Sequence, residues 1–152
     1  MSLHESMMMA ALEEANKAAV EGEVPVGAVI VQEGRIIAAD HNRREQNGDP
    51  TAHAEILVIQ EAARHLGRRR LNDCTLYVTL EPCPMCAGAI VMACIDRCYY
   101  GAADIRQGCA GSVLAIPQEP AFYHRTTCIG GLLEESCAAL MNAFFEQKRT
   151  NL

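Results

Sequence analysis

The segment Pro82-Cys83-Pro84-Met85-Cys86 has the residue types and the spacing of a metal-binding motif. Two cysteines three positions apart can bind one tetrahedral metal ion through their sulfur atoms. Pro84 fits the first position of a helix, because its missing N–H would be unpaired there in any case. We therefore expect both thiols at or next to a helix N-terminus, where the helix dipole favours thiolate over thiol. On its own, such a pair is more typical of a structural zinc or redox site than of a catalytic one.

His53 and Glu55 precede this motif by about thirty positions. A site made of His53, Cys83 and Cys86 has one protein ligand fewer than a closed structural zinc site, and a catalytic zinc ion keeps that fourth position for water. If Glu55 lies beside the water, it can accept a proton and then deliver protons to a ring nitrogen and to a departing amine, which is hydrolytic deamination. The order H-x-E followed by P-C-x-x-C is the signature of zinc-dependent nucleobase deaminases.

Length and composition indicate one domain over residues 1–152. Half of the residues are apolar and about a fifth are charged, which excludes a disordered chain. No apolar run is long enough to span a membrane, and the first residues lack the basic and apolar regions of a secretory signal. Together with cysteines that lie in apolar runs, this predicts a cytoplasmic protein with free thiols. Six cysteines outside the motif are expected to be core residues: Cys74, Cys94, Cys98, Cys109, Cys128 and Cys137.

The formal net charge of −6 argues against non-specific nucleic-acid binding, which depends on neutralising phosphates. The positive charge is nearly all arginine, however, and the planar guanidinium suits phosphate. A local basic surface on an acidic body and an ordinary solvated surface are both open from composition. The basic clusters are Arg43-Arg44, Arg68-Arg69-Arg70, His124-Arg125 and Lys148-Arg149.

Hydrophobic periodicity predicts an α/β fold in which helices alternate with strands around a mixed sheet covered on both faces. We expect both metal-bearing helices to begin at the carboxyl edge of the sheet, and Thr51 to cap the helix that carries His53 and Glu55. The expected helices cover residues 7–20, 52–66, 84–93 and 134–148, the expected strands 28–31, 35–39, 75–79, 97–100 and 126–129, and the main loops 40–51 and 101–111.

From Glu23 to the C-terminal helix the chain resembles bacterial tRNA-specific adenosine deaminases. The blocks that carry the resemblance are 23–28, 49–55, 76–83, 85–89, the loop 101–112, His124-Arg125 and the helix from Glu134 through Phe144-Phe145. The resemblance implies a three-layer α/β/α cytidine deaminase-like fold with a five-stranded mixed sheet. It further implies one Zn²⁺ per subunit, a homodimer, and conversion of adenosine to inosine at the wobble position of a tRNA anticodon stem-loop.

The resemblance also assigns substrate contacts. It places Asn42 against the flipped-out base, and Val24 and Ala54 in the wall of the pocket. It places Asp104, Arg106 and the C-terminal region around Phe145 against the anticodon loop. The chain departs from the family pattern at Ala103, where arginine is usual, at Arg106-Gln107-Gly108, which is often Lys-Thr-Gly, and at Cys109, where alanine is expected.

Two other functions are compatible with the motif. A deaminase of a free nucleobase or nucleoside, such as guanine, cytosine or adenosine, would use the same zinc chemistry, and the acidic net charge favours it slightly. A zinc-binding module without catalysis would need no carboxylate two positions after the histidine ligand, so the presence of Glu55 argues against it.

Overall fold

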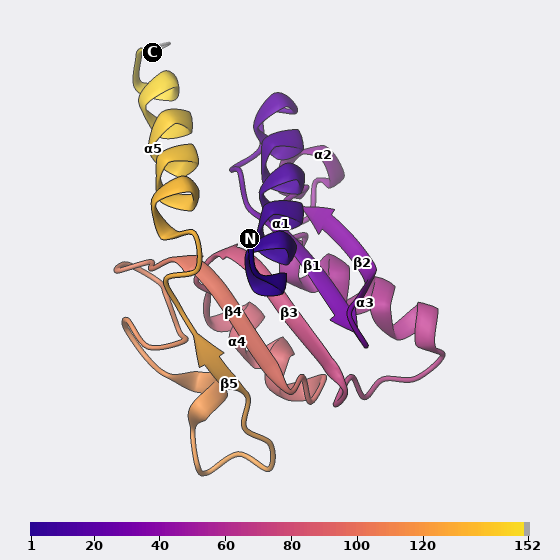
Figure 1. The fold of residues 1–152 in the computed structure, drawn as a ribbon. Helices are drawn as coiled ribbons and strands as arrows, with labels where there is room; N and C mark the ends of the chain where they lie inside the picture. The colour runs from indigo at the N-terminus through magenta and orange to yellow at the C-terminus, as the bar shows by residue number, and fades with distance from the viewer. Residues whose placement is uncertain (151–152) are drawn as a thin grey trace.

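The computed structural model describes residues 1–150 of the chain, and Figure 1 shows their arrangement. Helices and strands alternate along the chain in the predicted order. The elements are α1 (Leu3–Val20), β1 (Gly27–Gln32), β2 (Arg35–His41), α2 (Arg44–Asn47), α3 (Ala54–Leu66), β3 (Cys74–Leu80), α4 (Pro84–Met92), β4 (Arg97–Ala102), the 3₁₀ helix η1 (Ile116–Gln118), β5 (Thr127–Ile129) and α5 (Glu134–Thr150).

The five strands form one mixed sheet, as predicted, and their order in the sheet is β2-β1-β3-β4-β5. β1 is antiparallel to both of its neighbours, whereas β3, β4 and β5 are parallel to one another. β2, β3 and β4 therefore end at the same edge of the sheet. α3 follows β2, and α4 follows β3 directly, so both helices begin at this carboxyl edge, which confirms the predicted placement.

Two hydrophobic clusters cover the two faces of the sheet. The alternation of side chains along a strand sends Ala28 and Ile30 of β1 to one face and Val29 and Val31 to the other. The first face packs against α3 and α4, and the second packs against α1 and α5. Figure 1 shows these two helix layers on opposite sides of the sheet. The predicted α/β/α layering is thereby confirmed.

Three details of the expected helices and loops differ from the structure. α1 begins at Leu3 rather than Met7, because Ser2 and Glu5 form a capping box. The predicted loop 40–51 contains the one-turn helix α2. Thr51 does not cap α3, because its hydroxyl donates a hydrogen bond to Asp49 at 2.7 Å, and the N-cap residue is His53.

All eight cysteines are free; of the six outside the motif, all are buried except the half-buried Cys128.

The contact between α1 and β1 depends on a glycine. A Cβ atom at Gly27 would overlap the Ala11 carbonyl oxygen and the Ala15 amide nitrogen of α1. Gly27→Ala should therefore lower the free energy of unfolding by about 3 kcal/mol, since α1 would have to move off the sheet. The matched control is Gly88→Ala in the middle of α4, where a Cβ meets no atom within 4 Å and alanine should be neutral or stabilising. Urea unfolding of both variants checks this, and equal stabilities would contradict the packing account.

Within residues 1–150, no helix has the length and apolar character needed to cross a membrane.

Candidate active site

Three side chains with metal-ligating atoms lie at the N-termini of two helices. His53 is the N-cap residue of α3, and Cys83 is the N-cap residue of α4. Pro84 occupies the first turn of α4, as predicted, and Cys86 follows in the same turn. Since both helices begin at the carboxyl edge of the sheet, residues about thirty positions apart in the sequence meet at one point.

The geometry of this cluster fits a tetrahedral ion. His53 Nδ1 lies 3.6 Å from Cys83 Sγ and 3.5 Å from Cys86 Sγ, and the three ligand atoms lie within 4.8 Å of one another. Bonds of about 2.3 Å to sulfur and about 2.0 Å to nitrogen at tetrahedral angles would separate sulfur from nitrogen by about 3.5 Å. His53, Cys83 and Cys86 could thus hold Zn²⁺ with little movement, and they leave its fourth position free.

The electrostatics of the cluster also favour a cation. Hydrogen bonding from Cys86 and from His53 lowers the pKa of the Cys83 thiol to about 4. The hydrogen bond with Cys83, followed by burial, raises the pKa of the Cys86 thiol. Glu55 is 4% exposed, and burial followed by the charge of Cys83 raises its pKa to about 7. The two thiols and the carboxyl group cannot all be ionised here without a compensating positive charge. A divalent ion would supply that charge.

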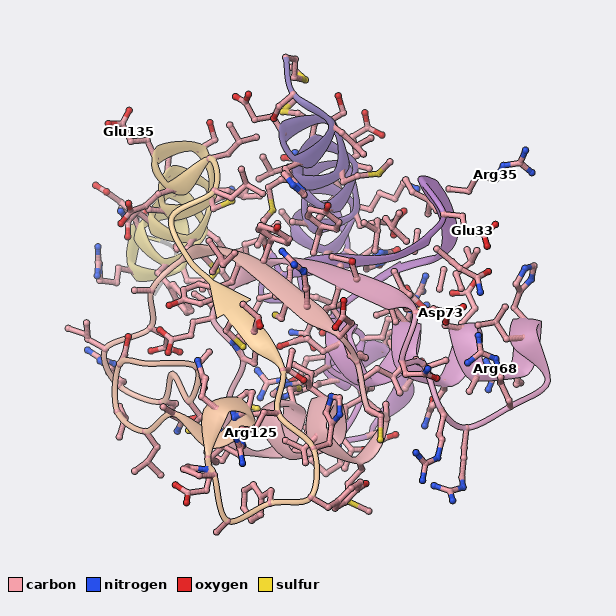
Figure 2. The ribbon with its side chains drawn as sticks, turned by 60° about the horizontal axis from the view of Figure 1, so that its bottom comes forward. Glu33, Arg35, Arg68, Asp73, Arg125 and Glu135 are labelled. Carbon is pink, nitrogen blue, oxygen red and sulfur yellow. The ribbon has the colours of Figure 1, made fainter. Side chains whose placement is uncertain are left out.

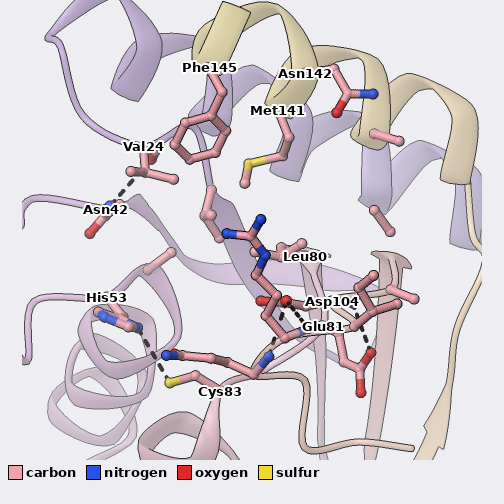
Figure 3. A pocket seen from close by; sticks show the side chains of 18 of the residues that line it. Val24, Asn42, His53, Leu80, Glu81, Cys83, Asp104, Met141, Asn142 and Phe145 are labelled. Atoms are coloured by element: carbon pink, nitrogen blue, oxygen red, sulfur yellow. Dashed lines mark hydrogen bonds between the residues drawn. The ribbon is translucent and has the colours of Figure 1, made fainter. Parts of the chain in front are cut away.

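A cavity of about 750 Å³ opens above the cluster at the carboxyl edge of the sheet. Figure 3 shows Phe145 and Met141 of α5 facing it from the side opposite His53 and Cys83. Every predicted site residue except the fully buried Cys86 lines this one cavity: Val24, Asn42, His53, Ala54, Glu55, Cys83, Asp104, Arg106 and Phe145. The structure thus brings together residues from six separate parts of the chain.

Asn42 lines the cavity and carries a buried acceptor atom. The side chain is 5% exposed, and its Nδ2 donates to the Val24 carbonyl oxygen at 3.3 Å. Its buried Oδ1 has no hydrogen-bond partner among residues 1–150. A buried acceptor without a partner is costly, so it is suited to a donor on a ligand. The Asn42 amide therefore binds the Val24 backbone through its nitrogen, while its oxygen has no hydrogen-bond partner among the described residues.

The two phenylalanines near the C-terminus have different surroundings. Phe144 is 8% exposed and lies under Lys148, whose Nζ is 5.2 Å from the ring centroid. Phe145 is 43% exposed and lines the cavity. Phe144 is therefore a core residue, whereas Phe145 faces the cavity. Asp104 also lines the cavity, but its Oδ1 accepts the backbone N–H groups of Arg106 and Gln107, so part of its role is to shape the loop.

Several lining residues were not predicted from the sequence. They include the basic side chains Arg44, Lys148 and Arg149, which together with Arg106 give the cavity four cationic groups. Arg44 has a buried Nε without a partner among the described residues. The basic clusters of the sequence were the signal that could have identified these side chains. However, not every basic cluster lies at the cavity. Arg68 pairs with Asp73 at 2.7 Å at the opposite edge of the sheet, as Figure 2 shows.

Comparison with known proteins places the chain in a family. The family model of MafB19-like deaminases matches residues 2–149. The tRNA-specific adenosine deaminase of Bacillus subtilis is 48% identical over 149 residues, which cover 98% of this chain and 92% of that protein. The chain belongs to the family of tRNA-specific adenosine deaminases.

Solved structures of the family support the same fold. A structure from a study of A-to-I editing by tRNA A34 deaminases at the wobble position superposes with a TM-score of 0.86 at 46% identity, covering 89% of this chain and 98% of that one. A guanine deaminase from Bacillus subtilis matches less well, with a TM-score of 0.64 at 43% identity over 68% of this chain and 66% of that one. The predicted cytidine deaminase-like fold is thereby confirmed.

The positions that depart from the family pattern differ in their exposure to the cavity. Ala103 lines the cavity, so alanine there leaves it without the positive charge that arginine would add. Cys109 is 1% exposed and does not line the cavity, so its thiol replaces a small buried side chain. The first departure affects the surface offered to a substrate, whereas the second affects packing.

Proposed function

We propose that the protein is a zinc-dependent hydrolytic deaminase that converts adenosine to inosine at the wobble position of a tRNA anticodon, with residues 1–152 as one deaminase domain. The observation that carries this proposal is a single cavity that joins the metal-ligating side chains of His53 and Cys83 and the buried Glu55 to a basic and aromatic rim on α5. The family membership of the chain gives independent support.

In this proposal His53, Cys83 and Cys86 hold Zn²⁺. The ion would act as a Lewis acid on a water molecule and lower its pKa toward neutrality. Glu55 would accept a proton from the water as the oxygen bonds to C6 of the adenine base, and would donate that proton to the ring nitrogen. It would then transfer the proton of the new C6 hydroxyl to the amino group, so that the C6–N bond breaks, ammonia leaves and a C6 carbonyl remains. Burial raises the pKa of Glu55, and a raised pKa suits a carboxylate that has to accept and return protons.

The other lining residues orient the nucleotide. The free Oδ1 of Asn42 can accept a hydrogen bond from the flipped-out base, while Val24 and Ala54 form the apolar wall around it. The half-exposed ring of Phe145 offers a surface on which a neighbouring base can stack. Arg106, and the newly identified Arg44, can bind phosphates on either side of the target.

The rim distinguishes an oligonucleotide from a free base. A free base carries no phosphate, so it would make no use of Arg44, Arg106, Lys148 and Arg149 around the same cavity. The acidic net charge of the whole chain does not oppose this, because four basic side chains line the cavity itself. Single-stranded loops are the usual RNA targets of such sites, since their bases can be extruded at low cost.

A deaminase of a free nucleobase is the second candidate, and the likeness to a guanine deaminase supports it. The test offers the zinc-loaded protein an anticodon stem-loop with adenosine at the wobble position and, separately, free adenosine, adenine, guanine and cytosine. Inosine in the stem-loop, with no ammonia from the free compounds, is the expected result. Ammonia from a free base and an unchanged stem-loop would overturn the tRNA proposal and keep the zinc mechanism.

We further propose that the protein acts in the cytoplasm as a homodimer. The cytoplasmic location rests on the free cysteines, and the homodimer rests on the resemblance to the family. Sedimentation equilibrium of the purified protein would test the homodimer, and a monomer at micromolar concentration would contradict it.

A further inference from the structure

Glu81 is a buried carboxylate that stands between the metal cluster and the substrate side of the cavity. It directly follows β3, two positions before Cys83, and only 1% of its surface is exposed. Four hydrogen bonds converge on its two oxygens from the segment 104–112. Oε1 accepts the Asp104 N–H at 3.0 Å and the Ser112 hydroxyl at 2.5 Å, and Oε2 accepts the N–H groups of Ala110 and Ser112, each at 3.0 Å.

Backbone hydrogen bonds hold the same two segments together on either side of this carboxylate. The Glu81 N–H donates to the Ala102 carbonyl oxygen at 2.9 Å, and the Cys109 N–H donates to the Pro82 carbonyl oxygen at 2.8 Å. The loop 103–112 therefore lies along the short segment 81–83, which ends in the metal-ligating Cys83. A shift in one segment would be transmitted to the other.

The carboxylate also fills the interior of the loop. A Cβ atom at Gly108 would overlap the carboxyl carbon of Glu81, so this position has room only for glycine. The outer part of the loop has little other support: Ile105 is 85% exposed, and Asp104 makes its side-chain contacts within the loop itself. Residues 103–107 nevertheless form one wall of the cavity.

We propose that Glu81 is a positioning residue that fixes the loop 103–112, and with it Arg106, in the conformation that binds the substrate. This inference deepens the proposed function and rests on it. The negative charge is essential to the role, because four donors face two oxygens. A glutamine of the same size would turn its own N–H groups toward two of those donors, and each buried donor left without an acceptor would favour an open loop.

The test compares Glu81→Gln and the milder Ser112→Ala with the wild type. Glu23→Gln is the matched control, because Glu23 is 2% exposed and accepts two backbone N–H groups, those of Glu45 and Gln46, outside the loop 103–112. Hydrogen exchange of assigned amides reports loop order without any substrate. We expect faster exchange at Asp104, Ala110 and Ser112 in Glu81→Gln and, to a smaller extent, in Ser112→Ala, but not in Glu23→Gln.

Kinetics on the stem-loop give the second readout. Glu81→Gln should raise KM roughly tenfold with a smaller change in kcat and one zinc ion per chain still bound. Arg106→Ala should then add little to the KM of Glu81→Gln, whereas its effect should be fully additive in Glu23→Gln. A merely structural role for Glu81 predicts additivity in both backgrounds.

The outcomes are separable. Unchanged exchange at the three loop amides, or additive effects of Glu81→Gln and Arg106→Ala, would overturn the inference even if the wild type deaminates the stem-loop. A wild type that leaves the stem-loop unchanged would instead refute the proposed function, and the exchange experiment would still decide whether Glu81 orders the loop. Should Glu81→Gln fail to fold, Ser112→Ala carries both readouts.

Discussion

Replacing Glu55 with alanine should lower turnover of the wobble adenosine by roughly 10²- to 10⁴-fold, the range expected when a general acid–base group is removed. The side chain is buried at the start of α3 and lines the cavity beside His53 and Cys83, and its raised pKa suits proton transfer. Zinc should remain bound, because Glu55 is not among the three proposed ligands. Single-turnover formation of inosine, with zinc measured by elemental analysis, gives both quantities.

Glu61→Ala is the matched control for this experiment. Glu61 lies two turns further along α3, is half-buried and does not line the cavity. Its removal should leave turnover within about twofold of the wild type, since surface substitutions away from a site have small effects. Turnover by Glu55→Ala at the rate of Glu61→Ala would refute the proposed mechanism.

Replacing Cys83 with alanine should reduce the zinc content from one ion per chain to nearly none and abolish activity. The variant keeps only one sulfur and one imidazole at the site, and the loss of a thiolate weakens the binding of a divalent ion strongly. The wild type should also melt at a higher temperature with zinc than after chelation, whereas the variant should show little difference. Elemental analysis and thermal melts in zinc and in chelator measure these effects.

Cys74→Ala separates loss of a ligand from loss of a buried thiol. Cys74 is fully buried at the start of β3, outside the metal cluster, and burial raises the pKa of its thiol to about 11, so it behaves as a small apolar group. This variant should be moderately less stable and keep one zinc ion. A full complement of zinc in Cys83→Ala would contradict the ligand assignment.

The metal cluster could be predicted from the sequence because its geometry is local. Pro84 starts a helix, three positions separate Cys83 from Cys86, and the alternation of strands and helices brings the start of α3 to the same edge. Each step depends on neighbours in the chain. The roles of Asn42 and Phe145 came only from the resemblance, and the structure adds the free Oδ1 of one and the exposed ring of the other.

The features that were missed depend on contacts between distant segments. The one-turn helix α2 begins where the carboxylate of Glu23 accepts the N–H groups of Glu45 and Gln46, more than twenty positions away. Glu81 likewise finds its donors in a loop that begins more than twenty positions later. Neither the hydrogen bonds of Glu23 nor those of Glu81 could be predicted from a pattern in the local sequence. Lys148 and Arg149 were visible as a basic cluster, but only the course of α5 brings them to the cavity.

One measurement tests the central claim most directly. The zinc-loaded protein is incubated with an anticodon stem-loop that carries adenosine both at the wobble position and elsewhere in the loop, and the product is sequenced for inosine. The account predicts inosine at the wobble nucleotide alone, because the rim of the cavity must bind the nucleotides on both sides of the target. An unchanged stem-loop, or inosine at every loop adenosine alike, would contradict it.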